Sequence, residues 1–232
     1  MSLSKAVPDF SPQSFARLAG FTLVATTLLG FVNTFFVKKG FSGLETFAAD
    51  VFRFRVGLSI DLTMFLLVIV MAWAFHRVTK PVNESLAAFG LIFRAGEGFI
   101  GCTAVCFGLI VFPILGREWP AFDAEQLRTL GMIFVKLFKV SWNVLYILMS
   151  MGAFAYMWLL HRARMVPRWL TAWGLFTYTV MFCYGFGAML FPDPVEGWIF
   201  VMFPGALFEL LLGLWLLAKG VALDGESGRR EC

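Results

Sequence analysis

Long apolar blocks, separated by short polar turns, make up most of the chain. Six of these blocks approach or exceed the about 20 residues that a helix needs to cross a bilayer. Proline, asparagine and charged residues gather between the blocks, where helices end. The pattern predicts an all-α, polytopic bundle of six transmembrane helices over residues 16–37, 54–75, 86–115, 129–160, 170–191 and 198–218.

Capping residues mark where several of these helices begin. Ser11 with Pro12 precedes the first block, Asn83 opens the third, and Asp123 with Gln126 forms a capping box before the fourth. The loop over residues 40–55 has an amphipathic pattern. It predicts a short helix along the membrane surface, with a lid over a cavity as the alternative.

Composition agrees with a membrane protein. Of the 232 residues, 59% are hydrophobic and 15% are charged, where a soluble domain has roughly half and a quarter. The mean hydropathy is +0.80. The lipid bilayer is therefore the expected partner, and the net charge of +4 predicts no nucleic-acid binding. We expect an N-terminal cytoplasmic segment (1–15), the membrane domain (16–220) and a flexible cytoplasmic tail (221–232).

The turns between the blocks predict an orientation. The turns HRVTKPVN and HRARMVPRW are basic, whereas FPDPVEG has two acidic residues and no basic one. Lysine and arginine collect on cytoplasmic loops. With six helices, both termini are therefore expected on the cytoplasmic side.

Ionisable residues inside the blocks are the first candidates for function. A charged residue in a membrane helix costs about 2.5–3.5 kcal/mol on insertion scales, and it usually belongs to a functional site. Three acidic and three basic residues occur here, so a neutral cluster is arithmetically available. From the helix rise we predict an outer Asp61–Lys136 pair and a central group near the midplane. The central group is Arg94, Glu97, Lys139 and Glu209.

The fourth block carries polar residues at helical spacing. Lysines, an amide and hydroxyls recur every three or four residues, which places them on one face of the helix. Trp142 lies beside this face. We call the set the polar stripe, and it consists of Lys136, Lys139, Asn143, Tyr146 and Ser150. A purely structural ion pair needs two residues, so the stripe favours a cavity that binds a ligand.

Cofactor chemistry is not indicated. The two histidines lie at predicted helix ends, so we expect no metal site. The spacing of Cys102 and Cys106 favours helix packing over a redox pair. Motifs for nucleotides, di-iron, haem or a hydrolytic serine are also missing, and we expect no cofactor.

Several segments together resemble one bacterial membrane family. They are ARLAG (16–20), FRFRVGLSIDL (52–62), KPVNESLAAFGLIFR (80–94), AFDAEQL (121–127), VPRWLTAWG (166–174) and FELLLGLWLLAKGV (208–221). Their order is similar to the family catalogued as domain of unknown function 4386. The resemblance implies a six-helix, multi-pass protein of the bacterial inner membrane, with no established activity. The segment KLFKVSWNVLYI departs from the family pattern, in which a histidine and glycines are usual.

Three functions fit these residues. The first is binding or translocation of a small solute or protons, with Asp61, Glu97 and Glu209 as acceptors and the basic residues as counter-ions. Six helices without an inverted repeat are few for a transporter, so this hypothesis includes a homodimer. The second is an acid/base isomerase or cyclase acting on a lipophilic, for example isoprenoid, substrate. Its catalytic groups would be Glu209, Glu97 and Asp61, within aromatic walls. The third is a structural or accessory subunit whose charges only organise packing.

Overall fold

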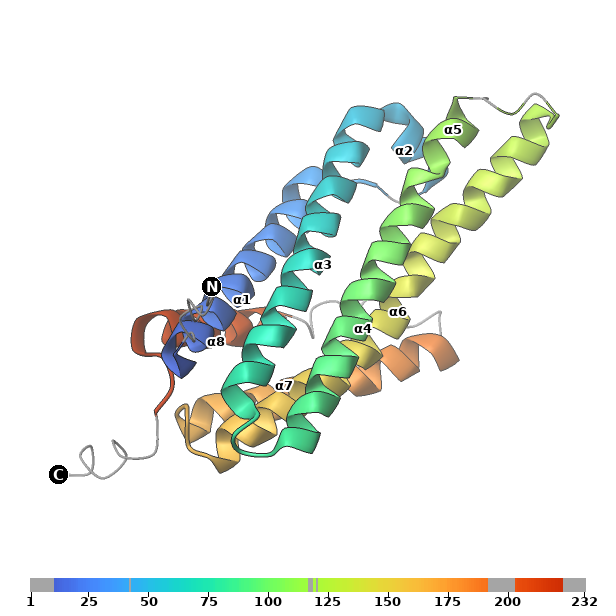
Figure 1. The fold of residues 1–232 in the computed structure, drawn as a ribbon. Helices are drawn as coiled ribbons and strands as arrows, with labels where there is room; N and C mark the ends of the chain where they lie inside the picture. Colours follow the sequence, from blue (N-terminus) through green and yellow to red (C-terminus); the bar gives the residue numbers. More distant parts are fainter. Residues whose placement is uncertain (1–10, 42, 117–118, 120, 192–202, 223–232) are drawn as a thin grey trace, which may run out of the picture.

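The computed structural model describes residues 11–41, 43–116, 119, 121–191 and 203–222. Within these ranges all the regular structure is helical, as predicted (Figure 1). The elements are α1 (Pro12–Val32), the π-helix η1 (Asn33–Val37), α2 (Leu44–Ala49), α3 (Val51–Thr79), α4 (Glu84–Leu109), α5 (Val111–Leu115), α6 (Ala124–Arg162), α7 (Arg168–Leu190) and α8 (Phe203–Lys219).

Five stretches of helix are long and apolar enough to cross a membrane: α1 with η1, α3, α4 with α5, α6, and α7. The chain is therefore a multi-pass membrane protein. The described part of α8 has 17 residues, or about 26 Å of helix. The count of six spans and the cytoplasmic position of the termini stay predictions.

The predicted helix starts are confirmed by their caps. The Ser11 hydroxyl accepts a hydrogen bond from the amide of Ser14, and the Asn83 side chain accepts one from Leu86. Asp123 and Gln126 form the reciprocal capping box of α6. These caps lie outside the apolar blocks, so the helices begin before the residues that hydropathy selects. At 39 residues, α6 is about 58 Å long and exceeds a hydrocarbon core of about 30 Å.

The amphipathic loop contains the expected short helix, α2, and it packs onto the bundle. The Phe47 side chain is buried, and its ring stacks on Phe54 of α3 with 4.0 Å between centroids. Helix α1 begins within the predicted 1–15 segment, and Val221 of the predicted tail contacts the side chain of Gln13. Residues 1–10, the acidic turn after α7 and residues 223–232 lie outside the described residues.

Helices α1, α3, α4 and α6 run roughly along one another, and α7 and α8 cross them obliquely near the start of α1 (Figure 1). Helix α1 packs on α3 and α8, α4 packs on α3 and α6, and α7 packs on α6. One close approach is made by Gly152 of α6. A Cβ there would lie 2.9 Å from the backbone nitrogen of Arg94 and 2.9 Å from the carbonyl oxygen of Gly90. This contact brings the middle of α6 against the charged part of α4.

Candidate binding cavity

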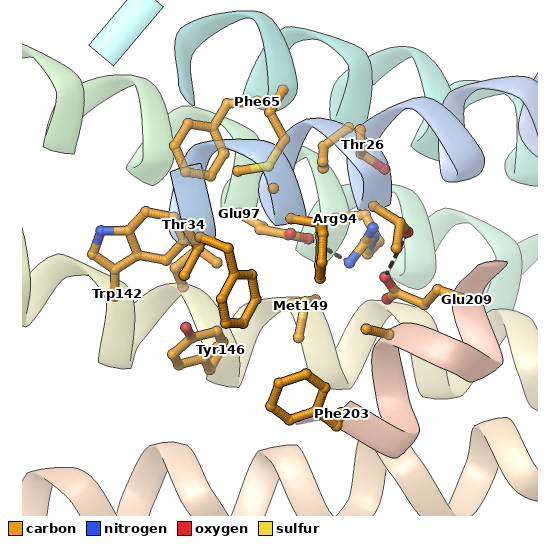
Figure 2. Close-up of a pocket in the computed structure, with 18 residues that line it drawn as sticks. Thr26, Thr34, Phe65, Arg94, Glu97, Trp142, Tyr146, Met149, Phe203 and Glu209 are labelled. Carbon is orange, nitrogen blue, oxygen red and sulfur yellow. Dashed lines mark hydrogen bonds and ion pairs between the residues drawn. The ribbon is translucent and has the colours of Figure 1, made fainter. Parts of the chain in front are cut away.

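A cavity of about 310 Å³ opens in the middle of the bundle, between α1, α3, α4, α6 and α8 (Figure 2). Its lining residues on α3, α4 and α6 lie near the middle of these helices. Such a volume falls at the lower end of the about 300–1,000 Å³ typical of ligand pockets. We call it the central cavity, and its polar or charged lining side chains are Thr26, Thr27, Thr34, Arg94, Glu97, Trp142, Tyr146 and Glu209.

Arg94 and Glu97 form an ion pair at one wall of this cavity. They stand three residues apart on α4, so they share a helix face. The Arg94 Nη1 and Glu97 Oε2 atoms are 2.6 Å apart, and both residues are almost completely buried, with 4% and 3% of their surface exposed. The other terminal nitrogen of Arg94 contacts the sulfur of Met71 on α3 at 3.8 Å.

Glu209 comes from α8, at the far end of the chain. Its carboxylate accepts hydrogen bonds from the Tyr178 hydroxyl at 3.0 Å and the Thr27 hydroxyl at 3.4 Å. Glu97 and Glu209 lie on either side of the Arg94 guanidinium (Figure 2). The structure therefore brings together three of the four residues of the predicted central group.

The charges of this group do not cancel. One guanidinium, Arg94, lines the cavity together with two carboxylates, Glu97 and Glu209. With all three ionised, the described lining has one negative charge in excess. An uncompensated charge away from water is costly, so the arrangement favours a positive occupant or a proton.

The polar stripe of α6 does not line a single space. Tyr146, together with the neighbouring Trp142, lines the central cavity. Ser150 is buried and donates a hydrogen bond to the carbonyl oxygen of Tyr146 within its own helix. Asn143 lies where α6 packs on α7, because its carbonyl oxygen is 3.2 Å from the place of a Cβ on Gly185. The residues of the polar stripe therefore do not share one role: Tyr146 lines the central cavity, whereas Ser150 and Asn143 make contacts within α6 or between helices.

Lys136 and Lys139 line a second cavity, of about 370 Å³, between α2 and α6. Arg128 and Glu45 also line it, and they form an ion pair at 2.7 Å. Both lysines are exposed on α6. The assignment of Lys139 to the central group is wrong, because Lys139 lies beside α2, 13 residues or about 20 Å of helix away from Gly152, which meets Arg94.

Asp61 pairs with Lys38, so the predicted Asp61–Lys136 pair is wrong. Asp61 also accepts a hydrogen bond from the Asn33 side chain at 2.6 Å. Lys38 and Asn33 follow and begin the π-helix η1, and the sequence reasoning missed both of them. Residues five apart on an α-helix point about 140° away from each other, whereas the wider turn of a π-helix brings them to one side. The polar residues of the first block, from Thr26 onward, were the available signal.

Among the described residues, no three His, Cys, Asp or Glu side chains come close enough to hold a metal ion. Cys102, Cys106 and Cys183 are free thiols. The expectation of no metal and no cofactor stays a prediction.

Comparison with known proteins supports the family that the sequence segments resemble. No match was found among curated proteins or among solved structures. A family model described as "Domain of unknown function (DUF4386)" matches residues 18–220, which include Asp61, Arg94, Glu97 and Glu209. Because this match covers most of the chain, the protein belongs to the DUF4386 family.

Proposed function

We propose that this protein binds a small solute in its central cavity, within the bilayer. The solute would pass between the cavity and either the lipid or the outer side of the membrane. The observation that supports the proposal is the excess carboxylate, two acids against one guanidinium in a space of about 310 Å³. A structural ion pair is already complete in Arg94 and Glu97. Glu209 adds a further carboxylate to the cavity wall, while the described lining residues include no second cation.

The location of the charges adds support. An ionisable group in a membrane helix marks a solute or proton pathway by default, since its insertion costs about 2.5–3.5 kcal/mol. Glu209 is held by two hydroxyl donors, which orient the carboxylate without neutralising it. Such a carboxylate is available to exchange between a proton and a cationic group.

The proposal includes a topology. Six membrane helices, with α8 as the sixth, would place both termini on the cytoplasmic side of a bacterial inner membrane, as the basic turns predict. A phosphatase that is active only outside the cytoplasm tests this when fused to the C-terminus. We expect no activity of the fusion in intact cells, and strong activity would overturn the orientation.

An acid/base enzyme is the second candidate. The Tyr178 hydroxyl donates to Glu209, and Tyr146 packs against Tyr184 with 5.7 Å between ring centroids. Aromatic faces beside a carboxylic acid would suit an isomerase or cyclase with a carbocation intermediate. In this case the protein would convert a bound lipophilic molecule. Liquid chromatography with mass spectrometry would detect the product as an isomer of equal mass and different retention time.

A variant with a large side chain in the cavity tests the proposal. Ala206 and its neighbour Leu207 on α8 are both exposed, but only Ala206 lines the cavity. We expect Ala206→Trp to occupy the space and Leu207→Trp to leave it open. Purified protein is heated with a panel of small neutral, anionic and cationic organic solutes, and the melting temperature is followed.

A solute that binds should raise the melting temperature of the wild type and of Leu207→Trp, but not of Ala206→Trp. The proposal fails if no solute of any charge class distinguishes the two tryptophan variants.

A further inference from the structure

We infer that the ligand of the central cavity is a lipophilic organic monocation, a protonated amine or quaternary ammonium, which enters from the lipid between α1 and α8. This inference rests on the proposed function, since it names the class of ligand for the same cavity. It depends on three features: the charge balance of the lining, its aromatic rings, and the position of its mouth.

The charge balance selects a single positive charge. Glu97 forms an ion pair with Arg94 at 2.6 Å, whereas Glu209 lies on the other side of the same guanidinium and accepts hydrogen bonds from two neutral hydroxyl groups. One cationic group beside Glu209 would make the buried set neutral. A dication would leave one positive charge in excess, and an anion would add to the negative excess. Since charges in a low-dielectric site interact strongly, neutrality is the dominant condition on the occupant.

Much of the remaining lining is aromatic, beside aliphatic and methionine side chains, and it suits an organic cation. The rings approach one another closely: Phe65 and Trp142 have centroids 5.6 Å apart, and Phe35 and Phe203 have centroids 5.8 Å apart. Aromatic faces attract ammonium groups, and the attraction is stronger where water is excluded. The rings of the lining are Phe31, Phe35, Phe65, Trp142, Tyr146 and Phe203.

A metal ion would fit this lining poorly. Hard cations such as Ca²⁺ take about six to eight oxygen ligands. The described lining offers the two glutamates, three threonine hydroxyls and a tyrosine, spread among phenylalanines. A proton could neutralise Glu209, but it would leave the space of about 310 Å³ without a role. An ammonium group with apolar substituents accounts for both the charge and the volume.

The mouth of the cavity faces outward between α1 and α8. Phe31, Phe35 and Phe203 line the cavity and are nevertheless 49%, 42% and 45% exposed. Phe31 and Phe35 belong to a stretch that is long and apolar enough to cross a membrane, so we expect this exposed aromatic surface to face lipid. A lipophilic cation concentrates in the bilayer, and its apolar part can pass between these rings while its charge moves toward Glu209.

Three probes of similar size test the class of ligand. They are benzyltrimethylammonium, its uncharged isostere neopentylbenzene, and the anion phenylmethanesulfonate. Apparent dissociation constants are taken from thermal-shift titrations of the purified protein. The Ala206→Trp variant in the same detergent gives the background from partition into micelles.

We expect the cation to bind the wild type at least about tenfold more tightly than its isostere, since a 1.4 kcal/mol difference gives that factor. Glu209→Gln should remove this preference and leave the isostere's affinity unchanged. Glu84→Gln is the matched control, because Glu84 is exposed and pairs with Lys80 away from the cavity. Trp142→Leu should weaken the binding of the cation more than the binding of the isostere.

Two results would overturn the inference. If the isostere or the sulfonate binds as tightly as the cation, the cavity still binds solutes and only the ligand class is wrong. If the cation does not bind, or if Ala206→Trp does not reduce its binding, the inference is wrong. The broader solute panel then tests the proposed function separately. Should Glu209→Gln not fold, the wild-type comparison and Trp142→Leu still decide.

Discussion

Substitution of Gly152 by alanine tests whether close packing of α4 against α6 positions the charged site. A Cβ at this position would lie 2.7 Å from Cγ of Arg94, and 2.9 Å from both the Arg94 nitrogen and the Gly90 oxygen. Two of these three atoms belong to the backbone and cannot rotate away. The two helices must therefore separate by several tenths of an ångström, or the Arg94 side chain must leave its place beside Glu97.

The magnitude follows from two opposing effects. Overpacking a tight contact costs typically 1–3 kcal/mol, and backbone overlap places this case near the upper end. Alanine gains about 1 kcal/mol over glycine inside a helix. We therefore expect Gly152→Ala to lower the free energy of unfolding by about 2 kcal/mol.

Gly96→Ala is the matched control. Gly96 also lies inside a helix of the same pair, and a Cβ there would have its nearest neighbour, a methyl of Leu148, at an ordinary 3.7 Å. This variant should be unchanged or more stable by up to about 1 kcal/mol. Unfolding is measured by titration with sodium dodecyl sulfate in mixed micelles. The reasoning is refuted if Gly152→Ala is as stable as Gly96→Ala.

Two further predictions concern contacts between helices. In a double-mutant cycle with Asp61→Asn, Lys38→Met should show a coupling of about 1 kcal/mol or more in the same titration, since a partly buried pair is broken. Lys136→Met should show none, and the opposite ranking would contradict the pairing in the structure. Tyr156→Phe should cost about 1 kcal/mol, because the Tyr156 hydroxyl on α6 donates to the Ala72 carbonyl of α3 at 2.8 Å inside the core. An unchanged unfolding midpoint would show that this hydrogen bond does not stabilise the helix pair.

Local features were predictable from the sequence. The capping box of Asp123 and Gln126 acts within one helical turn, and the structure has it where the sequence places it. The Arg94–Glu97 pair also needs only the helix, since residues three apart share a face. The burial of Asp61 follows from the cost of exposing a carboxylate to lipid.

The roles of the α6 lysines were not predictable in this way. Lys139 was expected at the level of the central group, but Gly152, which meets Arg94, lies 13 residues further along α6, or about 20 Å of helix. The level depends on how α6 packs on α4, and in the structure the lysines lie beside α2 while Tyr146 lines the central cavity.

The sequence by itself determined that the chain forms membrane helices, where several of them begin, and that Asp61, Arg94 and Glu97 are buried, because hydropathy and capping act over a few neighbouring residues. Only the tertiary structure decided the partners. It gave Asp61 to Lys38 through the π-helix η1, and it placed Glu209 beside Arg94 from a helix more than 100 residues away. The physical reason is that a charge in lipid must find some partner, while the choice among partners at equal depth depends on which helix surfaces can approach closely.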